Sequence, residues 1–147
     1  MEKDEMKRLA KKAKNGNVSA YGKLIESLKE YLYKTAMLSV KNEDVALDMV
    51  GECILRGFQK IHTMKNPEYF KTWLTRILFN VINDYHRSET YNEDVDAFEM
   101  PEPEKSIQKE DKMDLYQAID LLSDQYKQVI ILKYFDDLKI QEIAYVM

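Results

Sequence analysis

One stretch, residues 66–87 with the sequence NPEYFKTWLTRILFNVINDYHR, constrains the fold more than any other part of the chain. Its apolar residues recur at helical spacing and fall on one side of a helix: Phe70, Trp73, Leu74, Ile77, Leu78, Val81 and Ile82. An apolar stripe of this width predicts a helix whose back is buried against other helices. Asn66 suits the N-cap and Pro67 the first helical turn, so the helix is expected to begin there. We expect Trp73 to be a core residue, because it lies at the edge of the stripe.

The opposite side of this helix carries a row of polar residues at spacings of four or three positions: Thr72, Arg76, Asn80, Asn83 and Arg87. We call these five residues the polar row. Between Tyr69 and Ser88 the only acidic residue is Asp84. A face that is rich in hydrogen-bond donors and nearly free of acids suits a polyanion such as nucleic acid. A face that only contacts water is the plainer alternative, and spacing alone does not separate the two.

The composition predicts an all-α protein that is neither membrane-spanning nor disulfide-bonded. Of 147 residues, 45% are hydrophobic and 33% charged, with only four Gly and three Pro. No run approaches the roughly 20 apolar residues of a membrane span, so a cytoplasmic location is expected. The lone Cys53 has no partner for a disulfide, and two histidines beside it are poor material for a zinc site. We therefore expect Cys53 to be a buried thiol, and neither a metal nor another cofactor.

The charges divide the chain into two parts. Residues 1–90 contain 16 Lys and Arg against 12 Asp and Glu, whereas residues 91–147 contain 6 against 14. Residues 91–106 hold six of these acids and two of the three prolines, with no apolar period, which is typical of a linker. The predicted organisation is a mildly basic unit at 1–90, an acidic linker at 91–106 and a second helical unit at 107–147.

Further helices are expected at 3–14, from Asn17 or Ser19 to about 40, and from 42 to 61. In the third of these the predicted buried stripe is Leu47, Val50, Ile54, Phe58 and Ile61. Asp48, Met49, Glu52, Arg56 and Lys60 are then placed on its outer face. In the last unit, helices are expected at about 107–122, 124–135 and 139–147.

Four blocks of the sequence resemble the extracytoplasmic-function (ECF) sigma factors, small bacterial subunits that direct RNA polymerase to promoters. Residues 70–84 match the pattern F-x-x-W-L-x-x-I-x-x-N-x-x-x-D, and residues 13–24, AKNGNVSAYGKL, are similar to the A-x-x-G-D-x-x-A-F-x-x-L opening. Residues 46–52, ALDMVGE, resemble A-E-D-L-V-Q-E. Residues 122–130 and 133–144 look like the second domain of the family. The order of the four blocks is also that of the family.

The resemblance implies a fold and a set of partners. The fold would be a sigma-2-type helical bundle, an acidic linker and a sigma-4-type helix-turn-helix domain. A recognition helix of the G-T-V-x-S-R type would follow Met147, so the second domain is expected to be truncated, with Ile140, Ile143 and Met147 uncovered. The implied partners are core RNA polymerase, promoter DNA including the single-stranded −10 element, and an anti-sigma factor. No membrane contact by this chain is expected.

Roles for individual residues also follow from the resemblance. Asp48, Met49 and Glu52 would dock on the coiled-coil clamp of the polymerase β′ subunit. Asn80 would form one wall of a pocket that captures a base flipped out of the −10 element, and Met64 and Lys65 would belong to the capturing loop. The remaining residues that the resemblance places at the −10 DNA are Arg56, Lys60, Arg76, Asn83, Asp84 and Arg87.

Two functions remain open at this stage, and neither is enzymatic. The first is a sigma factor that docks on polymerase and melts the −10 element. The second is an interaction module that binds polymerase or an anti-sigma factor without activating promoters, which the missing recognition helix favours. The sequence contains no glycine-rich phosphate loop, and no carboxylate pair or Cys/His cluster spaced for catalysis.

Overall fold

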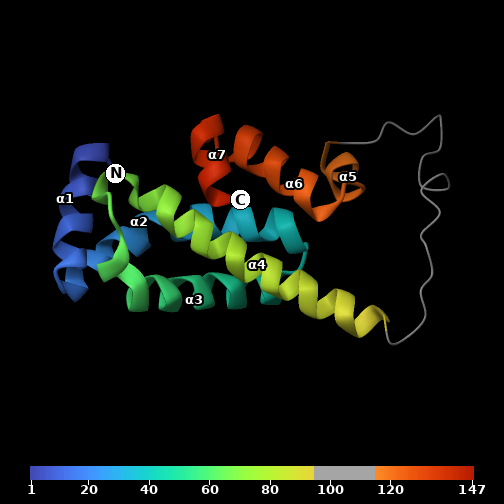
Figure 1. Ribbon diagram of the computed structural model, residues 1–147, viewed down its shortest axis with the longest axis horizontal. Helices are drawn as coiled ribbons and strands as arrows, with labels where there is room; N and C mark the ends of the chain where they lie inside the picture. The colour runs from blue at the N-terminus through green and yellow to red at the C-terminus, as the bar shows by residue number, and fades with distance from the viewer. Residues whose placement is uncertain (95–114) are drawn as a thin grey trace.

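The computed structural model describes residues 1–94 and 115–147, and every regular element in these ranges is helical (Figure 1). The first range contains α1 (Lys3–Lys14), α2 (Val18–Val40), α3 (Glu43–Lys60), the short 3-10 turns η1 (Ile61–Thr63) and η2 (Pro67–Tyr69), and α4 (Phe70–Asp94). The second contains α5 (Leu115–Asp120), α6 (Asp124–Ile130), the π-helical turn η4 (Ile131–Phe135) and α7 (Ile140–Val146). The all-α prediction is therefore confirmed. None of the described helices is both long and apolar enough to cross a membrane.

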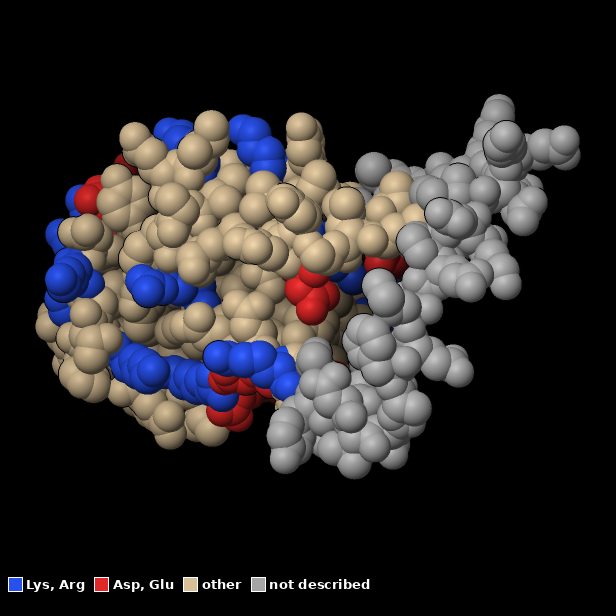
Figure 2. Space-filling view, turned by 45° about the vertical axis from the view of Figure 1, so that its right-hand side comes forward, with Lys and Arg blue, Asp and Glu red and all other residues tan. Residues whose placement is uncertain are grey.

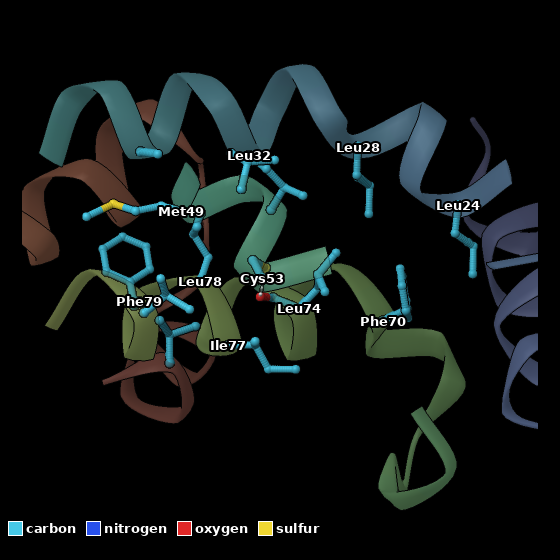
Figure 3. Close-up of a cluster of buried hydrophobic side chains, with 14 of the residues drawn as sticks. Leu24, Leu28, Leu32, Met49, Cys53, Phe70, Leu74, Ile77, Leu78 and Phe79 are labelled. Carbon is cyan, nitrogen blue, oxygen red and sulfur yellow. Dashed lines mark hydrogen bonds between the residues drawn. The ribbon is translucent and has the colours of Figure 1, made fainter. Parts of the chain in front are cut away.

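Helices α1 to α4 pack into one bundle, which we call the N-terminal bundle. Asn17 caps α2 by accepting a hydrogen bond from the Ala20 amide at 3.0 Å, and Asn42 caps α3 in the same way from Val45 at 3.1 Å. Inside the bundle, Leu24, Leu28 and Leu32 of α2 face the apolar stripe of α4 (Figure 3). The stripe predicted for α4 is buried, and Trp73 packs at its edge, 5.9 Å from Phe70 between ring centroids.

Helix α3 buries a different side from the one that its leucines predict. Leu47 and Phe58 are exposed, whereas Ala46, Met49, Val50, Cys53 and Gly57 are buried. The expected stripe is wrong at Leu47 and Phe58 because the side that faces α2 and α4 is made largely of small residues. Small residues let helix axes approach closely, and the larger side chains then fall on the outside.

Gly57 lies at a close approach of α3 to α2 and α4. A Cβ atom at this position would lie 2.7 Å from Tyr21 Oη and 2.9 Å from Leu74 Cδ1. Neither neighbour is free to move: Tyr21 donates a hydrogen bond to the Ile54 carbonyl oxygen at 2.6 Å, and Leu74 is fully buried. The absence of a side chain at 57 is therefore a packing requirement.

We expect Gly57→Ala to lower the free energy of unfolding by about 1–3 kcal/mol, because the overpacking outweighs the better helix propensity of alanine. The matched control is Gly51→Ala on the same helix, where an added Cβ would meet nothing within 4 Å. That control should stabilise the protein by roughly 0.5–1 kcal/mol. Urea denaturation followed by circular dichroism measures both; equal stabilisation by the two substitutions would contradict the packing at Gly57.

Helix α4 differs from its prediction at both ends. The chain enters through the 3-10 turn η2, and the Asn66 side chain makes no capping hydrogen bond, so α4 begins at Phe70 instead of beside Pro67. At the other end α4 runs to Asp94, so residues 91–94, predicted as linker, are helical. The rest of the predicted linker, 95–106, and the first part of the predicted second unit, 107–114, lie outside the described residues.

The described helices α5 to α7 with η4, residues 115–147, form what we call the C-terminal unit, and they pack on α2 and α4 (Figure 1). Ile131 and Leu132 are fully buried, and Ile143 and Val146 are buried as well. The expectation that Ile143 would be uncovered is wrong, because α7 packs its apolar side against α4. Ile140 and Met147 are exposed, as expected.

Candidate nucleic-acid interface

The C-terminal unit covers part of the polar row of α4. Thr72 Oγ1 donates a hydrogen bond to Glu142 Oε2 at 2.6 Å, and the Arg76 guanidinium lies 4.7 Å from the centre of the Tyr145 ring. Further along, Gln128 Nε2 donates to Asn83 Oδ1. Of these three residues, Thr72 is buried and Asn83 is half-buried, whereas Arg76 stays exposed beside the Tyr145 ring. Asn80 and Arg87 are exposed.

A buried polar contact holds the C-terminal unit beside α2. Asp136, at the end of η4, is 9% exposed and accepts hydrogen bonds from Thr35 Oγ1 at 3.0 and 3.2 Å. Tyr31 Oη lies 3.5 Å from the Asp136 carboxylate and 2.7 Å from Thr75 Oγ1. Burial raises the pKa of Asp136 to about 6, against the opposing effects of Thr35, the Lys71 charge and Tyr31. This carboxylate therefore titrates near neutral pH.

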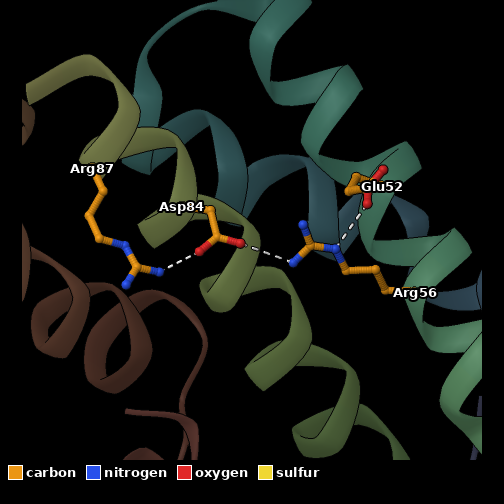
Figure 4. Close-up of polar contacts among 4 residues, drawn as sticks. All are labelled: Glu52, Arg56, Asp84 and Arg87. Atoms are coloured by element: carbon orange, nitrogen blue, oxygen red, sulfur yellow. Dashed lines mark hydrogen bonds and ion pairs between the residues drawn. The ribbon is translucent and has the colours of Figure 1, made fainter. Parts of the chain in front are cut away.

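Four charged residues form an acid–base cluster between α3 and α4 (Figure 4). Arg56 donates to Glu52 at 2.9 Å and to Asp84 at 3.2 Å, and Asp84 also pairs with Arg87. The hydrogen bond to Glu52 is the main reason that the pKa of Arg56 is raised. Three residues predicted for the DNA side, Arg56, Asp84 and Arg87, are thus brought together. Because the cluster is partly exposed, its ion pairs are worth little stability and can be exchanged for phosphate contacts.

Around the loop between α3 and α4, one residue predicted to contact DNA is buried, and two others are exposed as that role requires. Met64 is only 1% exposed, so its side chain belongs to the core and cannot stack on a base without leaving it. Lys60 and Lys65 are exposed. Beside the loop, a cavity of about 580 Å³ lies between α4 and α7. Its walls include Lys65, Tyr69, Trp73, Arg76 and Tyr145.

The three residues predicted to dock on polymerase differ in their exposure to solvent. Met49 is 4% exposed and lies beside Phe79 in the core, so the expectation that it faces outward is wrong (Figure 3). Asp48 is exposed, and Glu52 is half-buried in the acid–base cluster. Sequence reasoning missed two residues of this face, Leu47 and Leu55, which are 53% and 51% exposed. Their spacing of eight, with Gly51 midway, places them on one side of α3 next to Asp48.

Cys53 is fully buried, as expected. Its thiol donates to the Leu74 carbonyl oxygen at 3.6 Å, and burial raises its pKa to about 12, so the group stays protonated at neutral pH. In the part of the chain that the structure describes, no three His, Cys, Asp or Glu side chains are grouped to hold a metal ion. Figure 2 shows Lys and Arg side chains around several edges of the visible face, and along its lower edge acidic side chains lie directly against them.

Comparison with known protein families finds two matching regions. Residues 24–91 match the family model described as sigma-70 region 2, and residues 112–147 match the one described as sigma-70, region 4. The chain is 37% identical over 118 residues to the RNA polymerase sigma factor SigV of Bacillus subtilis (strain 168), covering 79% of this chain and 70% of SigV. It is 26% identical over 159 residues to the ECF RNA polymerase sigma factor SigW of the same strain, covering 97% and 84%.

A solved structure shares the fold. CnrH, in a complex with the cytosolic domain of CnrY, superimposes with a TM-score of 0.69 over 97% of this chain and 82% of that chain, at 20% identity. Sequence, helical architecture and the order of the two regions agree. The chain belongs to the extracytoplasmic-function sigma factors of the sigma-70 family.

Proposed function

We propose that this chain directs core RNA polymerase to promoters by docking through the outer face of α3 and capturing unpaired bases of the −10 element on α4. The observation that carries the proposal is the exposed Asn80 on α4, in one row with Arg76 and Arg87. A carboxamide both donates and accepts hydrogen bonds, so it can read a base edge that duplex pairing hides. The flanking guanidinium groups supply phosphate contacts.

Promoter melting then follows from differential affinity. A surface that binds the unpaired strand better than the duplex shifts the equilibrium toward the open form without nucleotide hydrolysis. Lys60 and Lys65 are exposed on and beside the loop and are proposed to contact backbone phosphates. Arg56 joins them once it exchanges Asp84 for a phosphate, which its 3.2 Å surface ion pair permits.

Docking on polymerase is proposed for the outer side of α3. Leu47 and Leu55 supply exposed apolar contacts, and Asp48 and Glu52 lie beside them with negative charge. Interfaces commonly combine an apolar centre with a charged rim that selects the partner. Met49 supports this face from beneath, because it packs in the core directly behind it.

The second candidate function is that of an interaction module, which binds polymerase or an anti-sigma factor without promoter activation. The contacts of Thr72, Arg76 and Asn83 with the C-terminal unit favour it, because they occupy part of the polar row. CnrH is solved with the cytosolic domain of CnrY, and we propose that an anti-sigma factor likewise binds this chain. The two candidates differ in whether polymerase-bound chain selects a DNA sequence.

The test is selection of single-stranded DNA from a random pool by the chain bound to core polymerase, followed by affinity measurement at fixed salt. We expect one sequence element to be enriched. Asn80→Ala should weaken its binding by about 1–3 kcal/mol, because the base edge loses its hydrogen-bond partner.

Gln125→Ala is the matched control, since Gln125 is an exposed carboxamide on α6, outside the polar row. It should leave the affinity unchanged. Stable docking with no enriched sequence would leave the second candidate, an interaction module, as the function.

A further inference from the structure

We infer that the C-terminal unit and single-stranded DNA compete for the polar row of α4, and that the buried side chain of Asp136 anchors the unit in the position that excludes DNA. The inference rests on the proposed function and adds a regulated access step to it. The polar row is then a surface with two alternative occupants, the C-terminal unit of the same chain and a single-stranded polyanion.

Three contacts place the C-terminal unit on the row itself. Glu142 of α7 accepts a hydrogen bond from Thr72, and Gln128 of α6 donates one to Asn83. The Tyr145 ring lies 4.7 Å from the Arg76 guanidinium, although Arg76 itself stays exposed. Asn80 lies between Arg76 and Asn83 in the row and is itself exposed. A strand that follows the whole row from Thr72 to Arg87 must therefore displace Glu142 from Thr72 and Gln128 from Asn83, although it reaches Asn80 freely.

The anchor lies on the other side of the unit, against α2. Asp136 is held by Thr35, and it is reached by the Tyr31 hydroxyl, which also meets Thr75 of α4. Asp136 therefore joins the C-terminal unit to both helices. Lys127 reinforces this side by donating to the Ser39 carbonyl oxygen at 3.4 Å, and Asp120 pairs with Lys41 at 3.1 Å.

The charged groups around Asp136 set the direction of a pH effect. Lys71 of α4 faces the carboxylate and favours its charged form, Tyr31 of α2 is a neutral hydrogen-bond partner with a raised pKa, and Glu142 of α7 lies near Tyr31. Burial prevails and raises the pKa of Asp136 from 3.8 to about 6. Closing the unit therefore takes up a proton, so closure is strengthened as pH falls toward 6 and below, and weakened above it.

The first arm of the test opens the unit. Affinity for a fluorescein-labelled single-stranded DNA of mixed sequence is measured by anisotropy, on the full chain and at fixed salt. Glu142→Ala combined with Tyr145→Ala removes two contacts with the row and leaves the buried core intact. We expect about five- to tenfold tighter binding, since a mostly closed chain binds DNA only through its open fraction. Tyr134→Ala, an equally large truncation at a 75% exposed tyrosine of the same unit, is the control and should change nothing.

The second arm tests the anchor. Wild-type affinity should fall by up to about fourfold from pH 8 to pH 5.5, as closure tightens. This decrease is opposite to the usual strengthening of DNA binding in acid. Asp136→Asn keeps one acceptor oxygen for the Thr35 hydroxyl without a titrating group, and it should abolish this decrease. Asp137→Asn, at the neighbouring exposed carboxylate, should retain it.

Hydrogen exchange of the α7 amides reports the opening directly. Release of α7 in the double variant with unchanged DNA affinity would overturn the competition. Full protection of α7 in both the double variant and Asp136→Arg would overturn the role of these contacts as the anchor. Failure of the proposed function looks different: the opened chain would bind DNA tightly, but Asn80→Ala in that background would have no effect.

Discussion

Leu74→Ala is expected to lower the free energy of unfolding by about 3–5 kcal/mol, because the cavity that it leaves cannot close. Leu74 is fully buried where three helices meet (Figure 3). Its Cδ1 lies 2.9 Å from the position of a Cβ on Gly57, and its carbonyl oxygen accepts from the Cys53 thiol. These close neighbours are fixed by the backbone of α3, so they have little freedom to collapse into the empty space.

The same truncation at Leu55 is the control, since this residue of α3 is half exposed and its loss should cost no more than about 0.5 kcal/mol. Urea denaturation of both variants gives the comparison. A cost below about 1 kcal/mol at Leu74 would contradict the packing of α3 on α4.

Leu55→Glu is expected to weaken binding to core RNA polymerase by about 2–4 kcal/mol, which is the size of an interface hot spot. Leu55 is an exposed leucine near Asp48 and Glu52, where a second apolar residue, Leu47, lies two turns away. A carboxylate at 55 would lose the apolar contact and add repulsion from the acids beside it. Stability should hardly change, because the side chain is already half in water.

Val18→Glu matches this substitution at the first residue of α2, where an exposed apolar residue is also replaced and an acid suits the helix N-terminus. It should bind polymerase as the wild type does. Surface-immobilised core polymerase measures both variants; equal affinities would place docking on another face of the chain.

The sequence predicted helices well where apolar spacing is regular. The stripe from Phe70 to Ile82 is buried in α4, although Thr75 and Phe79, which lie outside the stripe, are buried as well. In α3 the same reasoning chose Leu47 and Phe58, and it failed because Ala46, Cys53 and Gly57 let the helices approach on the other side. Hydrophobicity therefore predicts the buried side of a helix only where small residues do not let a neighbouring helix pack closely on another side.

The exposure of the predicted site residues agrees with the structure only in part, for a related reason. The exposure of Asn80 and Asp48 agrees with a role in contact with partners, although those roles are still predictions. The burial of Met49 and Met64 could not be predicted, because a methionine fits an irregular core gap as readily as a surface. The contacts of Thr72, Arg76 and Asn83 join residues 45 to 70 positions apart, and no local pattern encodes them.

Promoter opening by this chain on core polymerase is the central claim, and reactivity of unpaired thymines to permanganate tests it most directly. The substrate is duplex DNA that carries the sequence enriched by selection. We predict reactive thymines within that element only when polymerase and chain are both present, and a loss of reactivity with Asn80→Ala but not with Gln125→Ala. An unreactive duplex under conditions where the chain is docked on polymerase and binds the single strand would contradict the claim.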